Sequence, residues 1–217
     1  MTSFDRWVDA TLPLGPETPV FPGDPPVEVK EELTLKGGDP VNLRWYRLSG
    51  HHGTHVDAPR HLFDDGADVA SLDMVRFAGR AWVVEVPTET AITAEHLKSQ
   101  MPEKEELYRV FLKTAASEAW QNGNFRNFPI PYLLPEAAQF LMDRLIQLVG
   151  TDSLSVDPPD SHDLPSHKII LGAGVPILEG LDLSRVPPGL VHFVALPVRW
   201  AGADGAPVRV LIWPGRV

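Results

Sequence analysis

The side chains best suited to chemistry gather in one short stretch, HHGTHVDAPRH, at residues 51–61. Half of the eight histidines of the chain fall in it, and Asp57 stands among them: His51, His52, His55 and His61. Neutral imidazole binds zinc, manganese and iron, and carboxylates bind the same ions. The stretch therefore predicts a metal site. The competing interpretation, surface or capping histidines near a turn, explains a lone histidine better than a cluster.

His51, His55 and Asp57 form an H-x₃-H-x-D pattern that can meet at one point. In an extended segment, residues 55 and 57 project to the same side, and Gly53 lets the backbone turn so that His51 returns there. Three such ligands leave positions open for water and substrate, as in catalytic metal sites. His52 would face the other way in an extended segment and is not expected to be a ligand.

A metal site needs further ligands from elsewhere, and the best candidates lie in residues 157–183. His167 stands near the start of an expected helix, and Glu179 ends the apolar run VPILE. A glutamate buried without a partner is costly, so a metal ion would explain Glu179 in such a run. A place at the exposed end of a strand explains it equally well, and both interpretations stay open.

Composition excludes several classes of function. The formal net charge of -10 makes nucleic acid an improbable partner, because phosphate binding requires a basic surface. The chain has no cysteine, which excludes disulfides, zinc–thiolate sites and a cysteine nucleophile. Neither a signal-peptide core nor an apolar run of membrane-spanning length is evident. We expect a protein of the cytoplasm that acts on a small molecule.

The elements that must position these residues suggest a single mixed α/β domain over residues 1–217. Runs rich in β-branched and aromatic residues predict strands at residues 41–50, 80–87, 107–114, 189–200 and 206–213. Helices are expected at residues 93–100, at 134–150 with Pro135 in the first turn and Gly150 at the stop, and from Pro165 to Gly172 or Gly174. Strands outnumber helices and alternate with them irregularly, which indicates a mixed sheet that is partly antiparallel.

The two motifs resemble those of the cyclase family of metal-dependent hydrolases, and within it the bacterial-type kynurenine formamidases. The family signature H-x-G-T-H-x-D-x-P-x-H is matched without a gap by residues 51–61. A second signature, D-P-x-x-S followed by a histidine and a glutamate, is matched by Asp157, Pro158, Ser161, His167 and Glu179. The stretch TPVFPGD (residues 18–24) and the C-terminal strands are similar too, so the resemblance covers nearly the whole chain.

The resemblance implies a site for two zinc ions, or for manganese as in some members of the family. His51, His55 and Asp57 would hold the first metal. Asp57 and Glu179 would bridge to a second metal that His167 also holds. The implied fold is a barrel-like β/β/α arrangement of the swivelling type, with the site at one end of the sheet and subunits associated as homodimers or higher oligomers.

The implied reaction is hydrolysis of N-formyl-L-kynurenine to L-kynurenine and formate, a step of tryptophan breakdown. A metal lowers the pKa of bound water toward neutrality and so supplies hydroxide for attack on the amide carbonyl. The resemblance assigns His61 as proton donor and acceptor, although imidazole would serve equally well as a further ligand. Phe21 is implied to contact the substrate.

Three positions depart from the pattern of formamidase-like members. Phe21 stands where tryptophan is common, His52 where threonine is usual and His162 where lysine is common. We expect His162 to be a loop residue and Asp24 to cap a turn. These differences put the substrate in doubt and not the hydrolytic chemistry, so one alternative is a hydrolase of another aryl or cyclic amide or lactone, such as isatin. A metal-binding protein without catalysis is a separate alternative, disfavoured because the ligand set and His61 are all present.

Overall fold

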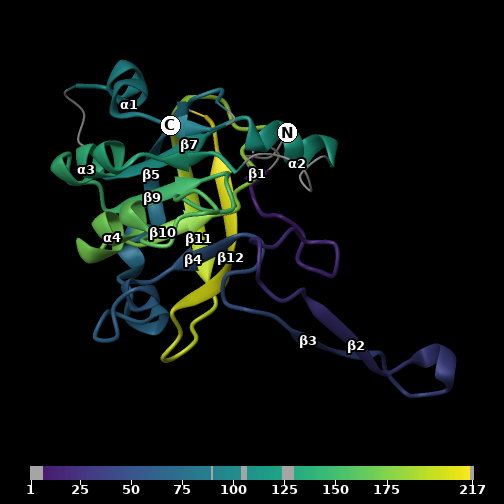
Figure 1. Ribbon diagram of the computed structural model, residues 1–217. Helices are drawn as coiled ribbons and strands as arrows, with labels where there is room; N and C mark the ends of the chain where they lie inside the picture. The colour runs from purple at the N-terminus through teal and green to yellow at the C-terminus, as the bar shows by residue number, and fades with distance from the viewer. Residues whose placement is uncertain (1–6, 89, 104–106, 124–129, 216–217) are drawn as a thin grey trace.

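A mixed eight-stranded sheet forms the centre of the computed structural model, which describes residues 7–88, 90–103, 107–123 and 130–215 (Figure 1). In order of pairing its strands are β1 (Val8–Asp9), β12 (Gly205–Trp213), β11 (Gly189–Pro197), β5 (Ala78–Glu85), β7 (Arg109–Lys113), β9 (Leu148–Thr151), β10 (Ile177–Glu179) and β4 (His55–Asp57). A further pairing of β4 with β12 closes the sheet into a barrel, to which β1 adds at β12. The predicted mixed, barrel-like α/β fold is confirmed.

The pairing is parallel in one half of the barrel and antiparallel in the other. β5, β7, β9 and β10 run parallel to one another, and β11, β12 and β4 complete the ring with antiparallel pairs. The parallel strands need long crossovers, and the helices lie in these connections: α1 (Ala94–Gln100), α2 (Ala116–Asn122), α3 (Pro135–Asp143) and α4 (Pro165–Gly172). α1, α3 and α4 gather on one side of the sheet (Figure 1).

Alternating side chains on the strands build two separate cores. Val83 of β5 and Leu148 of β9 belong to a cluster that fills the barrel. Their chain neighbours Val84 and Val149 belong to a second cluster, which includes buried residues of α1, α3 and α4. Successive strand residues face opposite sides, so parallel strands covered on both faces are apolar at every position. The helix-covered face of the sheet is the one that matters for the site.

The structure corrects the predicted helix at residues 134–150. α3 begins at Pro135 as expected but ends at Asp143, and residues 148–151 are β9. Leu145 has a φ of +57° and is 72% exposed, so the chain has already left the helix at this residue. Leu148, which fitted the helical spacing, belongs to β9. Gly150 is a strand residue and not a helix stop. β9 pairs with β7 on one side and with β10 on the other, and this pairing outweighs the helical propensity of the segment.

The other predicted elements are found within a few residues of their expected bounds, whereas α2 was not predicted. β2 (Glu28–Leu33) and β3 (Leu43–Arg47) form a two-stranded hairpin that projects from the body (Figure 1), and β6 (Ala91–Ile92) pairs with β8 (Tyr132–Leu133). Short 3₁₀ helices are Leu35–Gly37, Pro59–His61, Val69–Ser71 and Met74–Phe77. Within the described ranges, no helix has the length and apolar character needed to cross a membrane.

Candidate metal centre

Strands β4 and β10 place three candidate metal ligands on one face of the sheet. The strands pair antiparallel, with Glu179 opposite His55 and Ile177 opposite Asp57. Directly opposed residues share a face, as do residues two apart in one strand. Ile177 packs in the cluster between sheet and helices, so His55, Asp57 and Glu179 line the face that α4 covers. All three side chains are buried. Glu179 therefore does not lie at an exposed strand end, which was the alternative interpretation of its position.

His51 reaches this face because the chain turns between it and β4. Gly53 has a φ of +64°, a conformation that glycine adopts readily, and the turn predicted there is confirmed. The His51 ring also lies against Gly205, where an added Cβ would come within 2.5 Å of its Cε1 atom. Close contact with a glycine therefore fixes the ring between the Gly53 turn and the start of β12.

α4 contributes His167, and Asp157 orients its ring. The backbone N–H groups of Ser166 and His167 donate to the Asp157 carboxylate at 3.0 and 2.9 Å, and His167 Nδ1 lies 2.8 Å from Asp157 Oδ2. This arrangement directs His167 Nε2 toward Asp57 Oδ2 at 3.5 Å and Glu179 Oε1 at 3.3 Å. Metal-binding histidines commonly donate their other ring N–H to such a carboxylate.

Asp57 is shared by two groups of candidate ligands. His51 Nδ1 lies 2.7 Å and His55 Nε2 3.2 Å from Asp57 Oδ1. These three residues form one group, and Asp57, His167 and Glu179 form another; in each, the ligand atoms lie within 4.8 Å of one another. His55 Nδ1 is 3.0 Å from the Gly53 carbonyl, an acceptor only, so His55 donates there and turns Nε2 to the cluster.

The electrostatics of the cluster favour positive charge. Burial opposes the charged form of His51, but the hydrogen bonds and charges of Asp57 and Asp204 raise its pKa to about 9. The pKa values of His55 and His167 are also raised against the effect of burial, by the carboxylates around them. Burial would raise the pKa of Asp57, yet the surrounding histidines hold it well below its usual range. A divalent cation could take the place of these protons.

The residues present fit a divalent metal. Asp57 Oδ2 is buried and has no hydrogen-bond partner among the described residues, although its neighbour Oδ1 faces two histidines. An unsatisfied buried carboxylate oxygen costs free energy, and a bound cation would remove that cost. Imidazole and carboxylate donors together suit ions such as zinc and manganese. The structure thus brings all five predicted ligands together, and their roles in coordination stay predictions.

His61 lies beside the cluster and not within it. It ends the 3₁₀ turn Pro59–His61 and is partly exposed, with its ring centroid 4.1 Å from that of His51 and 5.9 Å from that of His167. It belongs to neither of the two groups that share Asp57; its own group contains His51 and Asp204. This position at the rim suits exchange of protons with a bound molecule.

A pocket of about 170 Å³ opens onto the cluster. Phe21, Leu154 and Leu164 contribute apolar surface, and Asp24, Ser49 and Ser155 contribute polar groups to its lining, beside His61 and the five candidate ligands. Phe21 therefore stands where a substrate contact was predicted. The volume is below the roughly 300 Å³ of small drug-sized pockets, so the part of a substrate that enters this pocket must be small.

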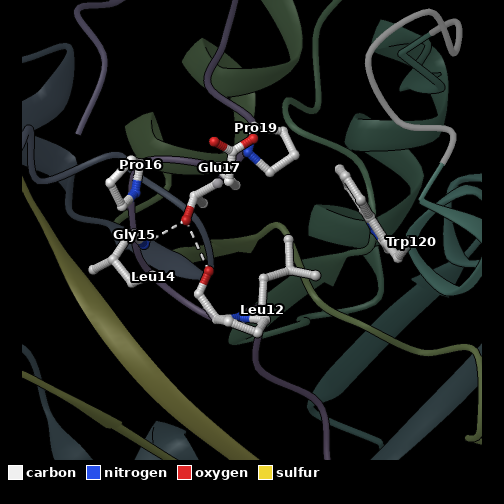
Figure 2. A pocket seen from close by; sticks show the side chains of 9 residues that line it. Leu12, Leu14, Gly15, Pro16, Glu17, Pro19 and Trp120 are labelled. Carbon is white, nitrogen blue, oxygen red and sulfur yellow. Dashed lines mark hydrogen bonds between the residues drawn. The ribbon is translucent and has the colours of Figure 1, made fainter.

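A second pocket shares none of this chemistry. It is lined by residues 12–19 and Trp120 of α2, and Figure 2 shows the leucine, proline and tryptophan side chains around it. Its lining has no residue in common with the pocket over Asp57. The lining of this second pocket is mainly apolar, whereas the smaller pocket over Asp57 contains titratable groups. The smaller pocket is therefore the better candidate for a reaction site.

The remaining histidines behave largely as predicted. His52 is buried away from both metal groups, and its Nδ1 accepts a hydrogen bond from the Ser49 N–H at 3.1 Å. His162 is an exposed loop residue. The Asp24 N–H donates to the Phe21 carbonyl, so Asp24 lies in a turn; that its side chain caps the turn stays a prediction, and Asp24 also lines the pocket.

Two carboxylates at the site were not predicted to act there. Asp157 was noted only as part of the second motif, and the structure shows it holding His167. Asp204 was missed entirely: its Oδ2 lies 3.0 Å from His51 Nε2, across 153 residues of sequence. The only local signal was its place in a turn between two predicted strands, which does not reveal its neighbours.

The fold and the site together define the class of protein. Residues 8–158 match the Cyclase family model, and the chain belongs to this family. Two curated relatives are named kynurenine formamidase: one from Bacillus cytotoxicus, 36% identical, with 96% of this chain and 98% of the relative covered, and one from Salinibacter ruber, 38% identical, with 94% and 96% covered.

Solved structures agree with this placement. A structure described as a potential metal-dependent hydrolase with cyclase activity aligns with a TM-score of 0.82 at 28% identity, covering 97% of this chain and 98% of that one. Isatin hydrolase A from Labrenzia aggregata, bound to benzyl benzoate, aligns with a TM-score of 0.79 at 26% identity, covering 95% and 93%. The predicted resemblance is confirmed.

Proposed function

We propose that this protein is a metal-dependent amidohydrolase that cleaves N-formyl-L-kynurenine to L-kynurenine and formate. The observation that carries the proposal is the buried Oδ2 of Asp57, which accepts no hydrogen bond among the described residues and lies amid imidazole and carboxylate groups, with His61 at the rim. Relatives named kynurenine formamidase, similar over nearly their whole length, support this substrate over others.

We propose two metal ions, each held by one of the two groups that share Asp57. His51, His55 and Asp57 would hold one ion, and His167 and Glu179 would hold the other with Asp57 as the bridge. Such ions polarise a carbonyl and make water a nucleophile at neutral pH. Zinc is the first candidate and manganese the second, since both accept nitrogen and oxygen ligands.

The protein's own groups would then orient the substrate and move the proton. The pocket admits the formyl end beside Asp57, and the apolar surface of Phe21 is placed to contact the rest of the substrate. His61 would take the proton from the attacking nucleophile and return it to the leaving arylamine. An arylamine is weakly basic, so its protonation asks less of His61 than an alkylamine would.

The alternative substrate class is a cyclic amide such as isatin. The structural similarity to isatin hydrolase A supports it, because the same ligand geometry would serve ring opening. Because Phe21 stands in place of the common tryptophan, its identity does not distinguish the two substrate classes, and the shape of the pocket would decide between them. The formamidase proposal is preferred because it rests on relatives of higher identity.

We also propose that the chain is one domain, acts in the cytoplasm and associates as a homodimer or higher oligomer. The β2–β3 hairpin supports the last point: it pairs with no other strand among the described residues and exposes Leu43, Trp45 and Tyr46. Leu43 and Trp45 lie two residues apart in β3 and share one face, and exposed apolar side chains that lie together can mark an association surface. The hairpin is bounded by the segments that carry Phe21 and Ser49, so an association there would also order the pocket rim.

Steady-state hydrolysis tests the function directly. The metal-stripped protein is reloaded separately with zinc and with manganese, and N-formyl-L-kynurenine and isatin are measured in parallel. We expect metal-dependent turnover of the formamide with a kcat/KM of about 10⁴ M⁻¹s⁻¹ or more, as for working enzymes. Faster turnover of isatin would favour the alternative, and metal binding without turnover of any amide or lactone would contradict an enzymatic role.

A further inference from the structure

Among the described residues, Asp204 is the one carboxylate that contacts both His51 and His61. Its Oδ2 lies 3.0 Å from His51 Nε2 and 3.5 Å from His61 Nδ1. Its side chain is about half exposed, unlike the buried Asp57, which faces the other ring nitrogen of His51 at 2.7 Å. Asp204 thus stands on the solvent side of the site, where His61 also lies.

The backbone holds Asp204 in this place. Its carbonyl accepts a hydrogen bond from the Ala58 N–H at 2.8 Å, and the next residue, Gly205, pairs with Asp57 in the β4–β12 ladder. The preceding Ala203 carbonyl accepts from the Val69 N–H at 3.0 Å. These contacts tie the turn to the strand that carries Asp57, so the carboxylate position follows from the fold.

Each histidine needs one particular nitrogen free for its role. A neutral imidazole carries one N–H, and the hydrogen bond made by one nitrogen decides whether the other is free as an acceptor or ligand. If Asp204 accepts the Nε2–H of His51, then Nδ1 is the nitrogen that can give up its proton and bind a metal ion held beside Asp57. If Asp204 attracts the Nδ1–H of His61, then the Nε2 atom of His61 is free to exchange a proton with a bound molecule.

We propose that Asp204 is a positioning residue that selects the working tautomers of His51 and His61 through its contacts with both rings. The role resembles that of a carboxylate behind a catalytic histidine, which holds the imidazole in one tautomer and orientation. The inference rests on the proposed function for the role of His61, whereas the tautomer of each ring is a property that is measurable without substrate.

A competing role would make Asp204 a metal ligand. His51, His61 and Asp204 offer ligand atoms within 4.8 Å of one another, as the two groups around Asp57 do. This third group lies nearer the surface: Asp204 is exposed and the histidines are only partly buried, whereas Asp57, His167 and Glu179 are all buried. The experiment must therefore count metal ions as well as measure turnover.

Asp204→Asn tests the proposal because the amide keeps the shape and removes the charge and one acceptor. Asp68→Asn is the matched control: Asp68 accepts a hydrogen bond from the Gly202 N–H of the same turn and contacts neither His51 nor His61. Both variants are loaded with zinc. Metal content, kcat and KM are measured, and long-range ¹H–¹⁵N NMR reports which nitrogen of each histidine carries a proton.

We expect Asp204→Asn to bind as many zinc ions as the wild type, with kcat lowered about 10- to 100-fold, KM nearly unchanged, and the His61 proton moved from Nδ1 to Nε2. Asp68→Asn should keep the wild-type tautomers and kcat. Unchanged tautomers in Asp204→Asn would overturn the proposal, and so would the loss of one zinc ion or an equal kcat loss in Asp68→Asn. The NMR result stands even if N-formyl-L-kynurenine is not the substrate.

Discussion

At the scale of single residues, the site is a set of histidines whose protons compete with a metal. The carboxylates around it raise the pKa of His51 to about 9 and raise those of His55 and His167 as well. In the metal-free protein His51 therefore carries a proton at neutral pH, and the equilibria of His55 and His167 are shifted toward their protonated forms. A cation that binds their nitrogens must displace the protons, so acid weakens binding and the affinity rises as the pH rises toward about 9.

Calorimetric titration with zinc in buffers of different ionisation enthalpy measures these protons. We expect about two or more protons released per protein at neutral pH, with apparent affinity falling steeply in mild acid. His162→Ala, at an exposed loop histidine, should release the same number. Release of no protons at neutral pH would show that the histidines are already neutral, and would contradict the electrostatic account of the site.

His61→Asn separates the two roles left open for this histidine. If His61 transfers protons, kcat falls about 100-fold or more while the zinc content stays that of the wild type. His162→Ala again provides the control, with unchanged kcat. A variant that loses a zinc ion would instead make His61 a ligand.

Much of the site was predictable because most of it is local. His51, His55 and Asp57 lie within seven residues of one another, so their spacing alone suggests a metal site. Asp204 was not predictable, because it meets His51 across 153 residues through the β4–β12 pairing. The spacing of residues shows what one segment can do, but not which distant turn the fold brings beside it.

At the scale of elements, β9 shows how packing overrides local pattern. Gly150 is buried in this strand, and an added Cβ would lie 2.5 Å from Phe111 Cδ1 and 2.9 Å from Leu181 Cδ1. Helical spacing continued through residues 145–148, so the sequence favoured one long helix. The strand exists because β7 and β10 pair with it on both sides, which no local pattern reveals.

Gly150→Ala should destabilise the protein, because the methyl group overlaps Phe111 in the barrel core. We expect a loss of about 1–3 kcal/mol in the free energy of unfolding, measured by urea denaturation. Gly172→Ala is the matched control at the end of α4, where the nearest atom lies 3.4 Å away. There the change should be neutral or slightly stabilising, since alanine favours helix. Equal stability of the two variants would contradict the packing described for β9.

At the scale of the whole molecule, contacts among the described residues of one chain do not explain what stabilises the β2–β3 hairpin. A two-stranded hairpin alone is only marginally stable in water, yet this one projects from the body with Leu43 and Trp45 exposed (Figure 1). Its residues 28–47 carry four acidic and four basic side chains, so the hairpin is neutral in a chain of net charge -10. Two copies would repel each other less through this surface than through the acidic body.

The double substitution Leu43→Lys with Trp45→Lys should therefore lower the oligomeric state. Light scattering after size exclusion measures the mass, and we expect a shift from oligomer to monomer. Leu145→Lys, at a leucine that is 72% exposed near the end of α3, is the control and should leave the mass unchanged. A double variant with the mass of the wild type would contradict the role of the hairpin.

We propose above that Asp57 lies between two metal ions. Anomalous X-ray diffraction from crystals of the zinc-loaded protein, recorded on both sides of the zinc absorption edge, would locate these ions. We expect two anomalous peaks that share the Asp57 carboxylate, one beside His51 and His55 and the other beside His167 and Glu179. A single peak, or peaks away from Asp57, would show that Asp57 does not bridge two ions.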